Sequence, residues 1–94
     1  MRRPPDASGQ HKDELSKRRK VIDALDLRIA PLLAARFRAA ASLRGLKPRI
    51  KDTGREAHVL ARAKAAARGR RLRAALGAAY TEIMRQSRRL QRAE

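Results

Sequence analysis

Arg36 and Lys47 are two cations placed where the sequence pattern predicts an apolar surface. Leucine and isoleucine recur every seven residues at positions 15, 22 and 29, and Arg36 takes the next position of that repeat. Lys47 follows eleven residues later, only about 20° further round a helix. A cation in a packed seam is costly unless an anion meets it. Two cations facing one interior therefore indicate an anionic ligand.

Other polar residues interrupt the apolar faces of the chain or lie beside them. Together with the two cations, the candidate site residues are Arg19, Arg36, Lys47, Asp52, Arg55, Glu56, Ser87 and Gln91. The chain has no cysteine, and its two histidines, His11 and His58, form no cluster in the sequence. We therefore expect no thiol catalysis, no disulfide, no metal site and no cofactor.

A long helix is required to position the first of these residues. The seven-residue repeat predicts one amphipathic helix over residues 15–47, beginning at Asp13 or Ser16. Pro31 lies within it and would bend the helix without ending it, because the repeat keeps its phase on both sides. Gly45 marks its end. Such a helix would be about 50 Å long, which suits an element shared between two subunits.

Two shorter helices are predicted after a connector over residues 49–54. Thr53 and Glu56 have the spacing of a capping box and would open the second helix, which Gly69 would end. The third helix would run from about residue 71 to residue 92, with one apolar stripe.

The core predicted from this pattern is thin. Leu, Ile, Val and Phe make up less than a fifth of the 94 residues, although the periodicity argues against disorder. We therefore expect the apolar stripes to be buried between chains in an obligate oligomer. Residues 1–12 lack periodicity and are predicted to be a flexible leader, and residues 13–94 a single all-α domain of three helices, one long and two shorter.

The formal charge of +16 is compatible with nucleic-acid binding. The basic residues are scattered round the predicted helices, however, and one Phe and one Tyr offer little surface for base stacking. A basic helical nucleic-acid-binding protein is therefore the more distant alternative. No apolar run is long enough to span a membrane, and a cytoplasmic protein is expected.

The order and spacing of the candidate residues resemble the AroQ class of chorismate mutases. The resemblance covers about residues 15–91 and rests on the cations of the first helix, on Asp52-x-x-Arg55-Glu56, and on Ser87-x-x-x-Gln91. It implies an intertwined, all-helical homodimer with shared active sites, which converts chorismate to prephenate in aromatic amino acid biosynthesis without a cofactor. The departures from the family pattern are Pro31 and a short, basic connector before Asp52.

The resemblance also implies which residues bind the two carboxylates of the substrate. Arg36 and Arg55 would bind them, Arg19 would do so from the opposite subunit, and Ser87 would lie beside one of them. Arg19 and Arg36 are 17 residues apart, roughly 25 Å along one helix, so they could hold one small ligand only from different chains.

The remaining implied roles concern the reacting bond and the ring. Lys47 and Gln91 would donate to the ether oxygen of the breaking bond, while Asp52 and Glu56 would meet the ring hydroxyl. The catalytic set would be Lys47, Gln91, Arg36 and Glu56. A Claisen rearrangement is intramolecular, so it requires a folded substrate and charge complementary to the transition state, but no nucleophile or proton shuttle.

Two related reactions, carried out by proteins of the same fold, remain as alternatives. One is isochorismate-pyruvate lyase, and the other is the rearrangement of 4-amino-4-deoxychorismate. Asp52 and Glu56 favour a substrate with a donor on the ring opposite the carboxylate, which argues for a mutase over the lyase. Carboxylates accept from a hydroxyl and from an amine alike, so they do not separate these two substrates.

Simpler interpretations exist for several of these residues. Asp52 has the character of a helix N-cap, and Glu56 that of a capping-box acid. Arg19 lies among other basic residues and could be a solvated charge. Ser87 could be a small interface residue, and Gln91 could be exposed near the end of the last helix.

Overall fold

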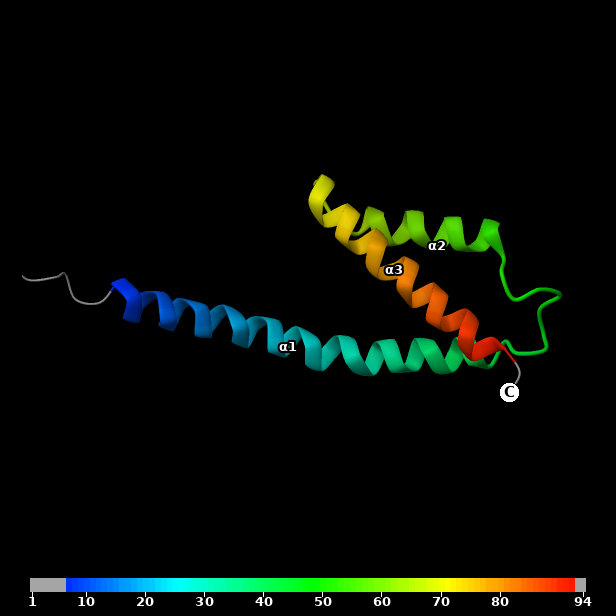
Figure 1. Ribbon diagram of the computed structural model, residues 1–94, viewed down its shortest axis with the longest axis horizontal. Coiled ribbons are helices and arrows are strands. Elements are labelled where there is room, and N and C mark those ends of the chain that lie inside the picture. The colour runs from blue at the N-terminus through cyan, green and yellow to red at the C-terminus, as the bar shows by residue number, and fades with distance from the viewer. Residues whose placement is uncertain (1–6, 93–94) are drawn as a thin grey trace, which may run out of the picture. The chain divides into compact units, whose positions relative to one another are not determined.

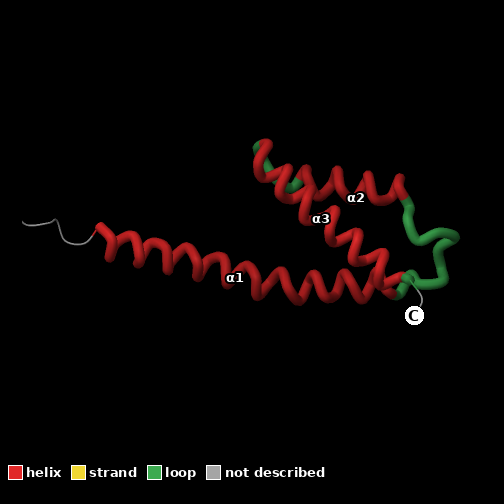
Figure 2. Tube along the Cα trace, viewed as in Figure 1, coloured by secondary structure: helices red, strands yellow, loops and turns green. Residues whose placement is uncertain are grey.

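The computed structural model describes residues 7–92, which form three α-helices and, within that range, no strand (Figures 1 and 2). The helices are α1 at Ala7–Ala41, α2 at Thr53–Ala65 and α3 at Arg70–Gln91. This confirms the predicted all-α class, with one long helix followed by two shorter ones. The contacts divide the chain into two compact units, with the boundary between Ala34 and Ala35.

The start of α1 differs from the prediction. The helix begins at Ala7 rather than at Asp13 or Ser16, so residues 7–12 of the predicted leader are helical, while residues 1–6 lie outside the described residues. Extending an existing helix is far easier than nucleating one, so this extension requires no capping residue at Asp13. α1 also continues through Pro31, as predicted.

The apolar stripe of α1 is exposed in the first unit. Leu15, Ile22 and Ile29 retain 48%, 55% and 52% of their accessible surface, and Leu25 retains 45%. Most of the stability of an amphipathic helix comes from packing its apolar face. The single chain therefore leaves this source of stability unused.

The end of α1 also differs from the prediction. The helix stops at Ala41 instead of continuing to Lys47. Ser42 Oγ donates to the carbonyl of Ala39 at 2.6 Å, which offers the backbone an alternative to helical pairing. The following turns close with short-range hydrogen bonds, and Gly45 adopts a positive φ of 78° that takes the chain off the helical path.

The second helix opens on a different cap from the one predicted. Asp52 is the N-cap, and its Oδ1 accepts from the backbone N–H of Arg55 at 3.0 Å. Thr53 is already the first helical residue, so the predicted capping box of Thr53 with Glu56 is wrong. The preference of a short carboxylate for the N-cap position explains the difference.

α2 and α3 pack against each other (Figure 1). α2 ends at Ala65 rather than at the predicted Gly69, which is instead the N-cap of α3 with a φ of 89°. A Cβ added at Gly77 would lie 2.5 Å from Cε of Lys64. The absence of a side chain on Gly77 thus lets the Lys64 stem cross α3 closely.

The buried side chains of the described residues all lie on one face of α3. Among the described residues, Met84 is the one buried hydrophobic residue, at 7% exposure, and two polar side chains, Ser87 and Gln91, are similarly buried at 6% and 8%. The predicted thin core is confirmed. A helix that directs polar groups inward at this cost indicates that they serve a site.

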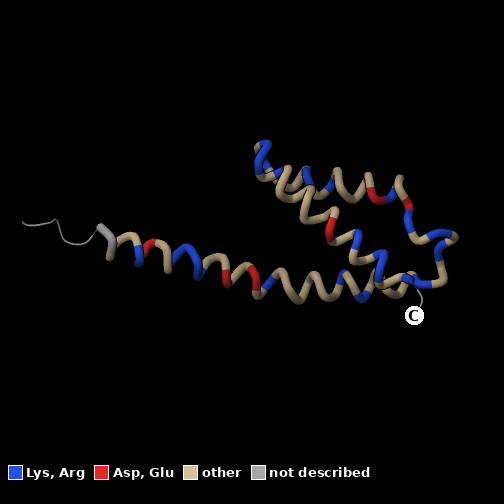
Figure 3. The backbone as a smooth tube through the Cα atoms, in the orientation of Figure 1, with Lys and Arg blue, Asp and Glu red and all other residues tan. Residues whose placement is uncertain are grey.

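Charge is distributed over the whole of the described chain. Figure 3 shows Lys and Arg on every helix and in the connector between α1 and α2. On the outer side of α3, hydrogen bonds from Arg85 and Gln86 lower the pKa of the exposed Glu82 carboxyl. None of the described helices is long and apolar enough to cross a membrane.

Candidate functional site

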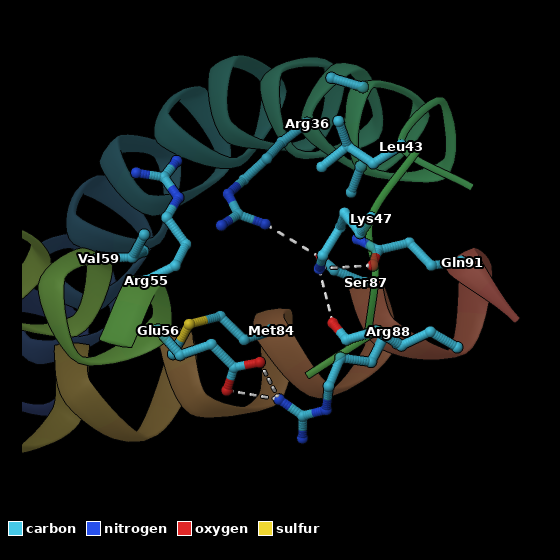
Figure 4. A pocket seen from close by; sticks show the side chains of 13 residues that line it. Arg36, Leu43, Lys47, Arg55, Glu56, Val59, Met84, Ser87, Arg88 and Gln91 are labelled. Atoms are coloured by element: carbon cyan, nitrogen blue, oxygen red, sulfur yellow. Dashed lines mark hydrogen bonds and ion pairs between the residues drawn. The ribbon is translucent and has the colours of Figure 1, made fainter. Parts of the chain in front are cut away.

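A cavity of about 320 Å³ lies in the second unit, between the end of α1, the connector, α2 and α3 (Figure 4). Its polar lining residues are Arg36, Lys47, Arg55, Glu56, Ser87, Arg88 and Gln91. Its apolar lining residues are Ala39, Ala40, Leu43, Ile50, Val59 and Met84. A cavity of this size with a few converging polar groups suits a small molecule. It unites six of the eight predicted site residues, all except Arg19 and Asp52.

Arg36 enters the cavity from the last turns of α1. Its Nη1 donates to Ser87 Oγ at 3.0 Å, and Ser87 Oγ in turn donates to the carbonyl of Ile83 at 2.8 Å. The guanidinium also lies over the ring of Tyr80, 5.8 Å from its centroid, a distance at which a cation and an aromatic ring attract. Among the described residues, no carboxylate pairs with Arg36. The guanidinium is thus oriented but not neutralised.

Lys47 and Gln91 meet across the cavity. Lys47 Nζ donates to Gln91 Oε1 at 3.0 Å and to the carbonyl of Ile50 at 2.6 Å. Because Oε1 accepts from Lys47, the Nε2 amide group of Gln91 keeps its hydrogens for another acceptor. The predicted shared helix face of Arg36 and Lys47 is wrong, since Lys47 follows α1. The turn at Gly45 nevertheless brings Lys47 to the same cavity.

Glu56 and Arg88 form the third polar contact of the cavity. Arg88 Nη1 lies 2.6 Å from both Oε1 and Oε2 of Glu56, and the two side chains are only 19% and 21% exposed. The pair joins the first turn of α2 to the last turns of α3. Sequence reasoning missed Arg88, because a basic residue at a helix C-terminus is ordinary. Its position four residues after Met84 and three before Gln91 places it on the inward face and could have revealed it.

Arg55 and Asp52, at the start of α2, line different hollows. Arg55 lines the cavity, and Figure 4 shows its side chain pointing away from the Glu56–Arg88 pair. Asp52 is exposed and lines a different hollow on the connector, together with Lys47 and Thr53. Its interpretation as a helix cap is confirmed, and the structure does not bring it into the cavity.

Arg19 belongs to the first unit. There it lines a hollow on the surface of α1 with neighbours that include Leu15, Ser16 and Asp23. No ion pair of Arg19 is found among the described residues. The cavity of the second unit is built from residues 36–91 and does not include it.

The charge of the cavity is strongly positive. Four cationic side chains line it, and Glu56 is the one acid among its lining residues. Only Arg88 of the four is paired with that acid. Such an excess suits a ligand with two negative charges. The described residues contain no group of His, Cys, Asp and Glu side chains that could hold a metal ion.

A comparison with protein families identifies most of the chain. The family model for chorismate mutase type II matches residues 18–92, which include every polar residue of the cavity. No curated protein and no solved structure matches the chain.

Proposed function

Because the chain belongs to the chorismate mutase type II family, we propose that its cavity converts chorismate to prephenate. The observation that supports this most is the convergence of Lys47 and Gln91 in a cavity whose other free cations are Arg36 and Arg55. Chorismate carries two carboxylates and an ether oxygen. The cavity offers cations for the former and two neighbouring donors for the latter.

In this proposal, Arg36 and Arg55 bind the carboxylates of the substrate. A guanidinium donates two parallel hydrogen bonds to a carboxylate, which fixes its orientation as well as its position. Ser87 holds one nitrogen of Arg36 at 3.0 Å and so sets the direction of the remaining donors. Holding both carboxylates selects a folded conformer of the substrate, which supplies much of the rate of an intramolecular reaction.

Lys47 and the Nε2 group of Gln91 donate to the ether oxygen. In the rearrangement this C–O bond breaks while a C–C bond forms within the same molecule, so no group leaves and no proton is transferred. Negative charge grows on the oxygen as the bond stretches. Each preorganised donor at such an oxygen is worth about 3 to 4 kcal/mol. The hydrogen bond of Lys47 to Ile50 holds the ammonium in place before the substrate arrives.

Glu56 accepts a hydrogen bond from the ring hydroxyl of the substrate. A carboxylate has about four acceptor positions, so it can serve the hydroxyl while it stays paired with Arg88. This acceptor favours the mutase over isochorismate-pyruvate lyase, the runner-up on the same scaffold. Asp52 caps α2, and we assign it no contact with the substrate.

The proposal includes a homodimer in which Arg19 of one chain completes the cavity of the other. The exposed stripe of Leu15, Ile22 and Ile29 supports it, because a second copy of the same stripe would bury this surface. Arg36 of one chain and Arg19 of the other would then bind the carboxylates from two sides.

One assay tests the proposed function. Purified protein is incubated separately with chorismate, isochorismate and 4-amino-4-deoxychorismate, and the products are followed by chromatography. We expect prephenate from chorismate as the fastest reaction, its abolition in Arg36→Ala, and normal turnover in Arg38→Ala. Arg38 is a matched control, because it is exposed on the same helix and does not line the cavity. Faster release of pyruvate from isochorismate would contradict the proposal.

A further inference from the structure

The Glu56–Arg88 pair places a cation directly behind the proposed acceptor of the ring hydroxyl. One nitrogen of Arg88 lies 2.6 Å from both carboxylate oxygens of Glu56. Figure 4 shows this guanidinium on the side of Glu56 that faces away from Arg36. Any group that binds Glu56 is therefore also close to the charge of Arg88.

From this geometry, and resting on the proposed function, we infer that Arg88 makes the site select a ring hydroxyl over a ring amine. Glu56 alone could accept from either group. An amine at that position is protonated at neutral pH and carries a full positive charge. With Arg88 present, the charge of Glu56 is already balanced, so an ammonium gains little attraction and meets the repulsion of the guanidinium.

The partial burial of the pair strengthens this effect. The side chains of Arg88 and Glu56 are 19% and 21% exposed, so solvent screens their charges less than it screens a surface pair. A hydroxyl is neutral and donates one hydrogen bond without opposing Arg88. The chemistry of the pair thus distinguishes chorismate from its 4-amino counterpart, which the two carboxylates predicted from the sequence could not do.

Arg88 could instead serve only to clamp α2 to α3. A clamp would affect the binding of every ligand to a similar degree, since its loss would loosen the whole cavity. A selective residue changes the ratio between a hydroxyl ligand and an amine ligand. The ratio of the affinities for a hydroxyl ligand and an amine ligand therefore tells whether Arg88 is a clamp or a selective residue.

The test uses two stable bicyclic dicarboxylate mimics of the transition state, one with a ring hydroxyl and one with an amine at the same position. Their Kd values are measured by calorimetry on the full-length protein. We expect the wild type to prefer the hydroxyl mimic by about tenfold or more, and Arg88→Leu to remove or reverse that preference. Arg88→Lys, which keeps the charge, should retain it. Arg88→Gln should behave like Arg88→Leu and serves if the leucine variant does not fold.

Arg89→Leu is the matched control. Arg89 is adjacent in sequence, exposed, and outside the cavity lining, so its loss should leave the ratio unchanged. If Arg88→Leu and Arg88→Gln weaken both mimics equally, Arg88 is a clamp and the inference is wrong. A wild type that binds the mimics but forms no prephenate would refute the proposed function, while the ratio would still decide the role of Arg88.

Discussion

Lys47 donates a 3.0 Å hydrogen bond to the side-chain oxygen of Gln91, and this contact joins the connector after α1 to the last turn of α3. The two residues are 44 positions apart in the sequence. Gln91 is 8% exposed although it lies at the end of its helix, where a glutamine is usually solvated. The contact therefore fixes both the position of a cation and the orientation of an amide in the candidate site.

Gln91→Glu should make activity depend on pH, with greater turnover in acid. At neutral pH the new carboxylate would pair with Lys47, and its charge would oppose the negative charge that develops on the ether oxygen. Protonation restores a donor and releases Lys47. Initial rates of prephenate formation between pH 4.5 and 8 measure this effect.

A matched substitution separates the site from a general effect of added charge. Gln10→Glu introduces the same acid on an exposed position of α1 and should leave the pH profile unchanged. An identical profile for Gln91→Glu and the wild type would remove Gln91 from the proposed role at the ether oxygen.

Asp52 should contribute to stability more than to turnover. Asp52→Ala removes the hydrogen bond to the backbone N–H of Arg55 and should lower the free energy of unfolding by about 1 kcal/mol. Asp52→Asn keeps a side-chain oxygen at the cap and should be nearly neutral. Both variants should turn over chorismate within about threefold of wild type when folded, because a residue outside the cavity makes no selective contact with the transition state. Thermal melts measure the expected loss of stability, and kcat/KM values measure the expected turnover. A large loss of kcat/KM in Asp52→Asn at unchanged stability would return Asp52 to the site.

Much of the fold follows from the sequence because it depends on periodicity. The repeat through Ile22 and Ile29 predicts the long helix, and between Leu15 and Ala41 Pro31 is the one helix-breaking residue that interrupts it. The helix ends are harder to predict, since they depend on single hydrogen bonds. The bond from Ser42 to Ala39 accompanies the end of α1 ahead of Gly45, and no periodic pattern encodes it.

The candidate site was predictable where its residues interrupt an apolar pattern. Arg36 stands out because leucine or isoleucine occupies the equivalent earlier positions of the repeat. Arg88 interrupts no such pattern, because it is one of two consecutive arginines at a helix end, where basic residues are common. Its helical phase with Met84 and Gln91 is the sequence signal for its inward position. Its role depends on its long-range partner Glu56, 32 residues earlier, which only the packing of α2 on α3 reveals.

The exposed stripe of α1 should mediate dimerisation. Leu25→Glu places a charge in the stripe and should yield monomers in analytical ultracentrifugation at micromolar concentration. Leu27→Glu is the matched control, since Leu27 lies about 200° round the helix from Leu25 and is 78% exposed. It should sediment as the wild-type dimer. A wild type that sediments as a monomer, or a Leu25→Glu variant that stays dimeric, would contradict the proposed interface.

The last prediction concerns the shared site. Arg19 and Arg36 belong to the same helix, and the proposal assigns them to one ligand from two different chains. Arg19→Ala and Arg36→Ala should therefore each inactivate the homodimer. Unfolded together in equal amounts and refolded, the two variants should form heterodimers as about half of the dimers. One site of each heterodimer carries both defects, and the other receives intact Arg19 and intact Arg36. About a quarter of wild-type activity should return, because half of the dimers have one of two sites working.

A second mixture provides the control for this experiment. Arg36 and Lys47 line the cavity of one and the same chain, so a mixture of Arg36→Ala with Lys47→Ala leaves one defect in every site of the heterodimer. That mixture should stay inactive, although mass spectrometry shows heterodimers in the same proportion. Recovery in the first mixture and not in the second would place Arg19 across the interface from Arg36. If both mixtures stay inactive with heterodimers present, Arg19 does not complete the cavity of the second chain, and the shared-site proposal is wrong.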